Sequence, residues 1–361
     1  MRNIIRANMV TRTPVKHCNR SRKTICVFAG SLAVLLALIC PSFQRRTTAN
    51  DQMDDDMDMR WYFRPIGMVG ALVDDGFVIN PTADKAYASI DYPGALLTSA
   101  FGINNAGNIV GFYQDTSKSV HGFFYNRVAG SFASIDNPDP ACTTGTDARG
   151  INKRGDIVGT CTDSANNFHG YLLTADGFSP VQAPGHLSTI PQRIAPDGRI
   201  VGCIHDTDTS TTMFGMSRDS DGFNFFGGKF GGMDGMGFMN DGVTAGGKRV
   251  VGMFMDTSLN RVRSYIVHRG VATPFDYPDA ALTQAWDVNA LGDVVGVYRD
   301  MGGRIHGYLR SVDGQFTSID FPGATLTRAF GINSDDDIVG TYIAGGVQHA
   351  FVRTAKSHAS Q

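Results

Sequence analysis

Four histidines each stand before a glycine or alanine and an aromatic residue, and three of them have an aspartate six residues upstream. The histidines are His121, His169, His306 and His349, and the aspartates are Asp115, Asp163 and Asp300. A histidine beside a carboxylate is the acid–base part of a hydrolytic triad. Catalysis needs a single site, however, whereas these pairs recur along the chain. We therefore interpret them as structural, with each histidine hydrogen-bonded to an aspartate or carbonyl of its own repeat.

Other motifs for chemistry are absent from the sequence. It has no Cys-x-x-Cys, His-Glu-x-x-His, Gly-x-Ser-x-Gly or phosphate-loop motif, so we expect no cofactor. The run Asp335-Asp336-Asp337 falls at an expected turn. A calcium ion needs several converging oxygens, which neighbours in sequence do not supply, so we expect no metal site.

Two of the cysteines form a candidate disulfide. Cys142 precedes an expected hairpin and Cys161 follows it, with the turn at Asn152–Gly155 between them. Export from the cell would favour a bond between them. Free thiols are the alternative, because geometry decides whether two cysteines can pair.

These residues recur because the chain repeats one unit. Its marker is a β-branched pair followed by glycine, and successive marker glycines are 41, 48, 43, 50, 44 and 44 residues apart. An Ala-Phe-Gly-Ile-Asn segment precedes the marker in the clearest copies, and His-Gly-Phe and Ser-Ile-Asp-x-Pro segments follow it. The Asn-x-x-Gly turns suit hairpins, and the runs between them are rich in strand-forming residues. The glycines are Gly70 in a weaker first copy, then Gly111, Gly159, Gly202, Gly252, Gly296 and Gly340.

Each unit is therefore expected to contain four short antiparallel strands. Four-stranded units of about 40–50 residues are typical of β-propeller blades, which bury their sheet faces against one another in a ring. Seven copies predict an all-β propeller of seven blades over residues 57–354. The last copy lacks its Ser-Ile-Asp strand, so we expect residues near 50–57 or the tail 355–361 to replace it, or that blade to keep three strands.

Function is expected where the repeat is broken. The first strand of a blade lines the central channel, where small or apolar residues are the rule in this chain. The exceptions are Asp147, Arg149, Arg193, Asp241, Asp287 and Arg328, with Trp286 beside them. We predict a ligand-binding site formed by these residues, at the end of the ring where the first strands begin. The alternative is structural ion pairing, since a buried charge is costly unless it is paired.

The recurring Gly-Ile-Asn-x-x-Gly-x-Ile-Val-Gly-x-Tyr phrase, followed by His-Gly-Phe, resembles the bacterial extracellular HAF repeats. That family is named for a His-Ala-Phe segment, which is His349-Ala350-Phe351 here. The resemblance covers roughly residues 65–353, although residues 181–270 fit it poorly. It implies an exported β-propeller-like protein and transfers no catalytic residue. The Gly/Met-rich segment 225–242 also departs strongly from the repeat, and we expect it to be either a mobile lid over one face of the ring or a degenerate blade.

The N-terminal region has the composition of a targeting segment. Residues 1–50 hold nine basic residues and no acid, and residues 25–40 carry no charge. This is the pattern of a signal peptide, and the apolar run is shorter than the about 20 residues of a membrane-spanning helix. Arg45 and Arg46 after the run also suit an uncleaved anchor. We expect a signal peptide or anchor over 1–40, an acidic linker over 41–56 and a tail over 355–361, in a secreted, periplasmic or membrane-anchored protein.

The rest of the chain is acidic. Residues 51–361 hold 32 − 9 = 23 basic residues against 34 acids, a formal charge of −11. Such a surface does not suit nucleic-acid phosphates. Every acid is aspartate, so a polysaccharide hydrolase or lyase would have to use an Asp/Asp pair. We favour a non-catalytic, monomeric binding module for a glycan or an envelope or extracellular protein, with the Asp-based enzyme as the alternative.

Overall fold

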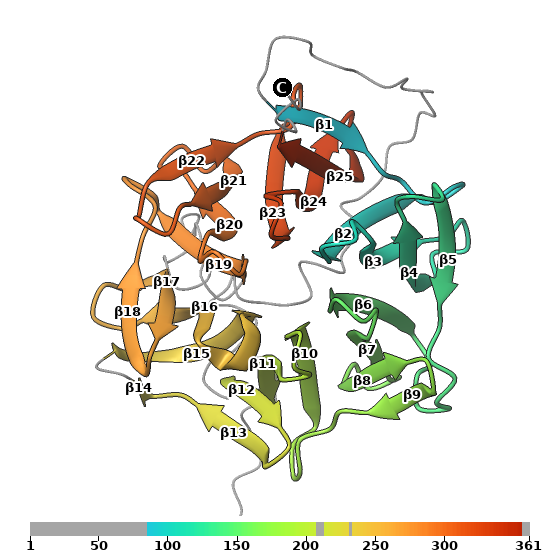
Figure 1. The fold of residues 1–361 in the computed structure, drawn as a ribbon, viewed down its shortest axis with the longest axis horizontal. Coiled ribbons are helices and arrows are strands. Elements are labelled where there is room, and N and C mark those ends of the chain that lie inside the picture. The colour runs from blue at the N-terminus through green and yellow to red at the C-terminus, as the bar shows by residue number, and fades with distance from the viewer. Residues whose placement is uncertain (1–84, 207–212, 231–232, 356–361) are drawn as a thin grey trace, which may run out of the picture. The chain divides into compact units, whose positions relative to one another are not determined.

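The computed structural model describes residues 85–206, 213–230 and 233–355, and these residues form an all-β propeller (Figure 1). Three sheets have four strands, one has five and one has eight. The eight-stranded sheet consists of two blades joined only by a parallel bridge between Val120 and Gly145. The five-stranded sheet is one blade with a short additional strand. The described residues therefore form six blades of four strands each.

Each blade is an antiparallel meander whose first strand lies nearest the ring axis (Figure 1). Blade 1 contains β2 (Leu97–Ile103), β3 (Ile109–Gln114), β4 (Val120–Asn126) and β5 (Ser131–Ile135). Blade 2 contains β6 (Gly145–Ile151), β7 (Ile157–Thr162), β8 (Phe168–Thr174) and β9 (Gly177–Pro180). Blade 3 contains β10 (Ser188–Ile194), β11 (Ile200–His205), β12 (Phe214–Asp219) and β13 (Gly222–Phe226).

The second half of the ring follows the same plan. Blade 4 contains β15 (Met233–Val243), β16 (Arg249–Asp256), β17 (Arg261–His268) and β18 (Val271–Phe275), with the short strand β14 (Lys229–Phe230) on β15 and a 3-10 turn, η3 (Ala245–Gly247), after it. Blade 5 contains β19 (Leu282–Val288), β20 (Val294–Arg299), β21 (Ile305–Arg310) and β22 (Phe316–Ile319). Blade 6 contains β23 (Leu326–Ile332), β24 (Ile338–Ala344) and β25 (Val347–Ala355).

The fourth strand of blade 6 comes from the other end of the described chain. Strand β1 (Lys85–Ser89) pairs antiparallel with β25, from Lys85 opposite Ala355 to Ser89 opposite Phe351. The expectation that residues 50–57 or the tail would replace this strand was wrong. The Ser-Ile-Asp phrase of the first sequence copy supplies it, because one blade combines the end of one copy with three strands of another.

The predicted number of seven blades is not confirmed. The described residues close into a ring of six, in which β2 of blade 1 packs against β23 of blade 6. The marker Gly70 of the first predicted copy lies outside the described residues, as do the predicted targeting segment over 1–40 and the predicted linker over 41–56. Within residues 85–206, 213–230 and 233–355, no helix is long and apolar enough to cross a membrane.

The Gly/Met-rich segment 225–242 is not a lid over the ring where it is described. Residues 233–243 form β15, the innermost strand of blade 4, and Phe238 and Met239 are buried there. This outcome fits the alternative of a degenerate blade.

The marker glycine recurs for a steric reason. In every blade, a Cβ atom at this position would lie 1.8–2.0 Å from a carbonyl oxygen of the first strand. In blade 5, the Cβ atom at Gly296 would also lie 2.7 Å from the ring of Tyr308. Only glycine therefore allows the first strand, the second strand and the aromatic residue of the third strand to pack this closely.

We predict that Gly296→Ala lowers the free energy of unfolding by about 3 kcal/mol, because the added methyl group overlaps Gln284 and Tyr308. Gly302→Ala is the control, since its Cβ atom would come no closer than 3.3 Å to a side-chain oxygen of Asp300. Urea unfolding of both variants checks the prediction. Equal stability of the two variants would contradict the steric explanation of the repeat.

Candidate functional site

The predicted charged residues gather at equivalent places on the first strands. Each first strand has a β-bulge at the same point, and the bulged residues are Phe101, Arg149, Gln192, Asp241, Trp286 and Phe330. Arg193 and Asp287 directly follow a bulge, and Asp147 and Arg328 stand two residues before one. We call the buried residues Asp147, Arg149, Arg193, Asp241 and Asp287 the hub.

One hub pair joins two residues of the same strand. The Arg149 Nε and Nη2 donate hydrogen bonds to the Asp147 carboxylate at 2.9–3.1 Å, and Nη1 donates to the Gln192 side chain at 2.9 Å. The carboxylate also accepts hydrogen bonds from the amide and hydroxyl of Thr160, both at 2.9 Å. Both charged side chains are at most 2% exposed. Asp147 is thus fully engaged with neighbouring protein groups.

Arg193 links the blades at the axis. Its Nη1 donates to the carbonyl oxygens of Arg149 in blade 2 and Gln192 in blade 3 at 2.9 and 2.7 Å. Its Nη2 donates to the carbonyls of Phe101 in blade 1, at 2.8 Å, and Phe330 in blade 6. Its Nε lies 3.2 Å from the carboxylate of Asp287 in blade 5. A guanidinium has five N–H donors, and the four on Nη1 and Nη2 are all used in these hydrogen bonds, while Nε contacts Asp287 as an ion pair.

The Arg193 side chain fits at the axis because most other blades have glycine at the equivalent position, directly after the bulge. In blades 1, 2, 4 and 6 the residue after the bulge is glycine, and its Cβ atom would lie 2.6–2.8 Å from the backbone of the next blade. Blades 3 and 5 instead have Arg193 and Asp287, which form an ion pair. Burial raises the pKa of Asp287, although Arg193 and the amides of Val288 and Ile332 act in the opposite direction.

Asp241 is the exception among the hub acids. Its side chain is fully buried, and neither carboxylate oxygen has a hydrogen-bond partner among the described residues. Burial raises the pKa of Asp241 well above its ordinary value, against the attraction of Arg193 and Arg149. With Asp241 protonated, the hub holds two arginines and two carboxylates, so its charges balance.

The ion-pair alternative thus accounts for Asp147, Arg149, Arg193 and Asp287. Arg328 is partly exposed, and Trp286 is buried with its ring 4.8 Å from that of Phe330. The predicted role of these seven residues in ligand binding stays a prediction.

The repeated histidines belong to networks within the blades. In blades 1 and 5, Nδ1 of His121 and His306 lies 2.6 Å from the Ser-Ile-Asp carboxylates of Asp136 and Asp320. In blade 6, Nδ1 of His349 lies 2.7 Å from Asp91, beside the closing strand β1. A serine hydroxyl donates to each of these carboxylates at 2.8–2.9 Å, so the aspartate stands between serine and histidine. In these three blades the serine hydroxyl thus bonds to the aspartate and not to the histidine.

Blade 4 has an arginine at the position of the repeated histidine. Arg263 occupies the place of the histidine and makes ion pairs with Asp256 and Asp276 at 3.1 and 2.9 Å. A guanidinium holds its proton throughout the ordinary pH range and cannot act as a general base. In blade 4 the position is thus filled by a group that bridges two aspartates without acting as a base. This supports the structural interpretation of the repeated pairs in blades 1, 5 and 6.

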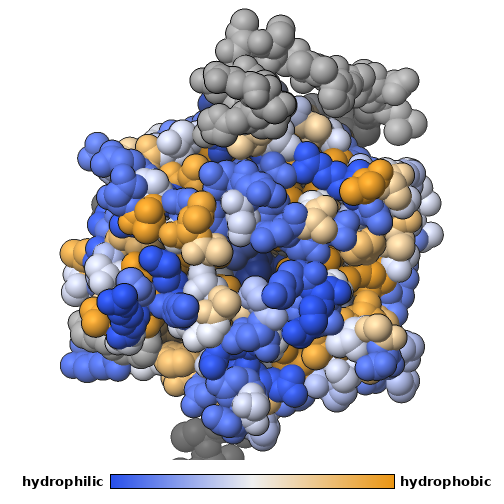
Figure 2. Space-filling view, in the orientation of Figure 1, coloured by the Kyte–Doolittle hydropathy of each residue, from blue (hydrophilic) through white to orange (hydrophobic). Residues whose placement is uncertain are grey.

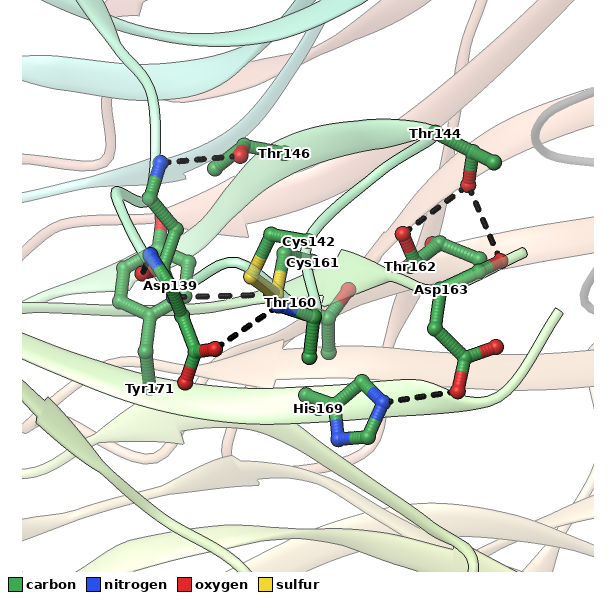
Figure 3. Close-up of a disulfide and its surroundings, with 12 residues drawn as sticks. Asp139, Cys142, Thr144, Thr146, Thr160, Cys161, Thr162, Asp163, His169 and Tyr171 are labelled. Atoms are coloured by element: carbon green, nitrogen blue, oxygen red, sulfur yellow. Dashed lines mark hydrogen bonds and ion pairs between the residues drawn. A yellow bond between two sulfur atoms is a disulfide. The ribbon is translucent and has the colours of Figure 1, made fainter. Parts of the chain in front are cut away.

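The candidate disulfide is present. Cys142 and Cys161 are bonded, with their Cα atoms 5.2 Å apart (Figure 3). Cys161 takes the place that Tyr113 holds in blade 1. In blade 1 that tyrosine stacks on Tyr92, at a centroid distance of 3.6 Å, so the disulfide replaces an aromatic contact between consecutive blades. Cys203 is a free buried thiol, and burial raises its pKa.

Three pockets are candidates for a ligand site. The axial pocket, of about 160 Å³, is lined by the hairpin ends of all six first strands, with Arg193 and Asp287 in its lining. It lies where the first strands end, whereas we predicted the end where they begin. Figure 2 shows one face of the ring, where hydrophilic residues surround a depression at the centre.

Two larger pockets, each of about 350 Å³, lie away from the axial pocket. The interblade pocket is lined by Gln114, Lys118, Val120, Thr144, Gly145, Thr146, Asp147, Thr162, Asn166 and Phe168. It lies at the predicted end, but Asp147 is the one predicted site residue in its lining. The other lining residues were missed. Only the Asp115–Ser119 and Asp163–Asn167 turns were visible in the sequence, and it does not show that they flank one pocket.

The outer pocket lies beside the last strands of blade 2. It is lined by Asn137, Pro138, Asp139, Pro140, His169, Gly170, Tyr171, Phe178, Ser179, Pro180 and Gln182. Within the part of the chain that the structure describes, no group of three or more His, Cys, Asp or Glu side chains is arranged to hold a metal ion.

Comparisons with known proteins give fold-level likenesses. No protein-family model matches the chain, and no curated protein matches it. A six-bladed fucose-binding lectin from Aleuria aurantia is 11% identical with a TM-score of 0.44, over 76% of this chain and 100% of the lectin. A gluconolactonase from Xanthomonas campestris is 12% identical with a TM-score of 0.44, over 75% and 89%. TolB from Acinetobacter baumannii is 10% identical with a TM-score of 0.48, over 69% and 64%. At these values the likenesses carry no inference about ligands.

We predict that Arg193→Met destabilises the propeller by about 3–5 kcal/mol, because it leaves Asp287 buried without its cation. Adding Asp287→Asn should recover part of this loss, since the neutral amide needs no counter-charge. Urea unfolding of both single variants and the double variant gives the coupling energy. Additive effects would show that the two side chains do not depend on each other.

We also predict that Asp241→Asn raises the free energy of unfolding at pH 7.5 by about 1–3 kcal/mol. Burial raises the pKa of Asp241 and so favours its protonated form in the folded chain, whereas the unfolded chain loses this proton above the ordinary pKa of 3.8. We therefore expect the stability of the protein to fall as pH rises beyond that value. Asparagine cannot ionise, and the variant should lose this pH dependence. The measurement is urea unfolding at pH 5 and pH 7.5. A loss of stability of the same size at both pH values would contradict the protonated state.

Proposed function

We propose that this protein is an exported, non-catalytic propeller that binds a glycan in the interblade pocket. Ligand pockets usually have volumes of about 300–1,000 Å³. The interblade pocket, at about 350 Å³, falls within this range, whereas the axial pocket, at about 160 Å³, does not. Size therefore favours the interblade pocket over the axial one.

The lining of the interblade pocket suits a sugar, which has an apolar ring face and hydroxyl groups around it. Val120 and the buried ring of Phe168 supply apolar surface. The Gln114 side-chain oxygen is buried without a hydrogen-bond partner among the described residues, so it can accept from a hydroxyl. The exposed Lys118 makes no ion pair within the described part of the chain, so its ammonium can donate to a ligand. The unpaired Gln114 oxygen is the observation that carries the proposal.

The alternative of an Asp-based hydrolase or lyase has less support. A glycosidase needs two carboxyl groups, on either side of the bond that it cleaves. Asp147 is the one carboxylate in the lining of this pocket, and Arg149 and Thr160 already engage both of its oxygens. Binding is therefore the function that this arrangement favours.

Export rests on two further observations. The Cys142–Cys161 bond is of the kind that forms in oxidising compartments. The resemblance to extracellular HAF repeats, together with the basic and then apolar N-terminus, agrees with it. These observations support a secreted or periplasmic location.

We predict that Gln114→Ala and Lys118→Ala each weaken glycan binding at least tenfold, a loss of about 1.4 kcal/mol. The full chain is first screened on a glycan array, and affinities for a bound glycan are then measured by calorimetry. Lys153→Ala is the matched control, because this exposed lysine lines the axial pocket. A loss with Lys153→Ala alone would move the site to the axis. Release of new reducing ends from a bound glycan would favour the enzyme.

A further inference from the structure

His169 differs from its counterparts in the repeat. In blades 1, 5 and 6, Nδ1 of the histidine contacts the Ser-Ile-Asp carboxylate. In blade 2 the equivalent position is Gln182, and Nδ1 of His169 has no hydrogen-bond partner among the described residues. The other ring nitrogen, Nε2, lies 3.0 Å from the Asp163 carboxylate, as Figure 3 shows. The ring is thus oriented on one side and unpaired on the other.

The state of Asp163 decides which nitrogen of His169 carries the proton. Burial would raise the pKa of Asp163, but hydrogen bonds from His169, Asn167 and Ala165 outweigh it and lower the pKa to about 2. An ionised carboxylate only accepts hydrogen bonds, so Nε2 must donate. In the neutral imidazole, Nδ1 then has a lone pair and acts as an acceptor.

The outer pocket holds other acceptors but few available donors. The Gln182 amide nitrogen donates to the His186 carbonyl at 2.9 Å, while the Gln182 side-chain oxygen is buried without a partner. The hydroxyls of Ser179 and Tyr171 donate to the carbonyls of Leu172 and Asp147. The Asn137 amide contacts the Cys161 sulfur.

The lining of the outer pocket also carries negative charge. Asp139 contributes a carboxylate to the outer pocket, and the lining contains no lysine or arginine. One oxygen of Asp139 accepts from the Ala141 amide, and the other is not so engaged among the described residues. Phe178 and three prolines, Pro138, Pro140 and Pro180, supply apolar wall. The pocket therefore combines acceptors, one negative charge and apolar surface.

We propose that the outer pocket binds a small primary amine as its ammonium ion. The three N–H groups of an ammonium match the acceptors of His169, Gln182 and Asp139, and its carbon chain matches the proline and phenylalanine wall. The disulfide supports this site, because Cys142 is anchored to Cys161 and its amide donates to the Asp139 carbonyl at 2.9 Å. The loop that forms one wall is thus held against blade 2.

The test compares three probes with the same four-carbon chain: n-butylammonium, n-butanol and butyrate. Binding to the full chain is followed by NMR, through the backbone amides of Gly170 and Gln182. Butylammonium should shift these signals saturably, with butanol at least tenfold weaker and butyrate without effect. Equal binding of butanol, or binding of butyrate, would overturn the assignment of a cationic ligand.

Two variants of blade 2 test whether butylammonium binds in the outer pocket. His169→Phe and Gln182→Ala should each weaken butylammonium binding at least fivefold, and blade 3 already has phenylalanine at the position of His169, namely Phe214. His121→Phe is the matched control, because the Nδ1 of His121 already contacts Asp136. Unchanged binding in both blade 2 variants would overturn the proposal. Gln114→Ala should leave amine binding intact, so failure of the glycan site and of this site can be told apart.

Discussion

The ring depends on one buried guanidinium at its axis. A propeller closes only if its blades meet at the centre, where backbone carbonyls are removed from water and need donors. Arg193 supplies these donors to blades 1, 2, 3 and 6 and its charge to Asp287 in blade 5. A side chain that breaks the repeat thus joins five of the six blades.

The blades divide into two groups around this centre. Blades 1, 5 and 6 keep the tyrosine, serine, aspartate and histidine network, and each stacks its tyrosine on an aromatic residue from the preceding blade. Blades 2, 3 and 4 have replaced parts of it. Blade 3 has Ile204 and Phe214 in place of the tyrosine and histidine, and blade 4 has Phe254 and Arg263. The structure therefore has a regular half, blades 5, 6 and 1, and a varied half, blades 2, 3 and 4, which contains the outer pocket.

Much of the architecture could be predicted from the sequence, because local chemistry repeats. The marker glycine, the Asn-x-x-Gly turns and the alternating apolar residues each act within one blade, so they gave the strands and their order. The number of blades could not be derived this way. One copy of the repeat in the sequence does not correspond to one blade of the structure, because β1, from the other end of the described chain, completes blade 6.

The site was predictable only in part, for a related reason. The sequence of a single strand shows that Arg149 or Asp241 departs from the repeat. Whether such a charged side chain has an ion-pair or hydrogen-bond partner depends on residues of other blades. Arg193 takes its carbonyl partners from β2, β6 and β23, which lie far apart in sequence. The interblade pocket was missed because Lys118 and Asn166 look like ordinary turn residues until the blades meet.

The closure of the ring also determines when the ring can form. Of the described strands, β1 is synthesised first and its partner β25 last, more than 250 residues later. Until then β1 lacks the partner strand that it has in the ring, and this edge is open to pairing with other chains. Completion of the ring is therefore a late event that requires β25 to have left the ribosome, and a chain truncated before β25 cannot complete it.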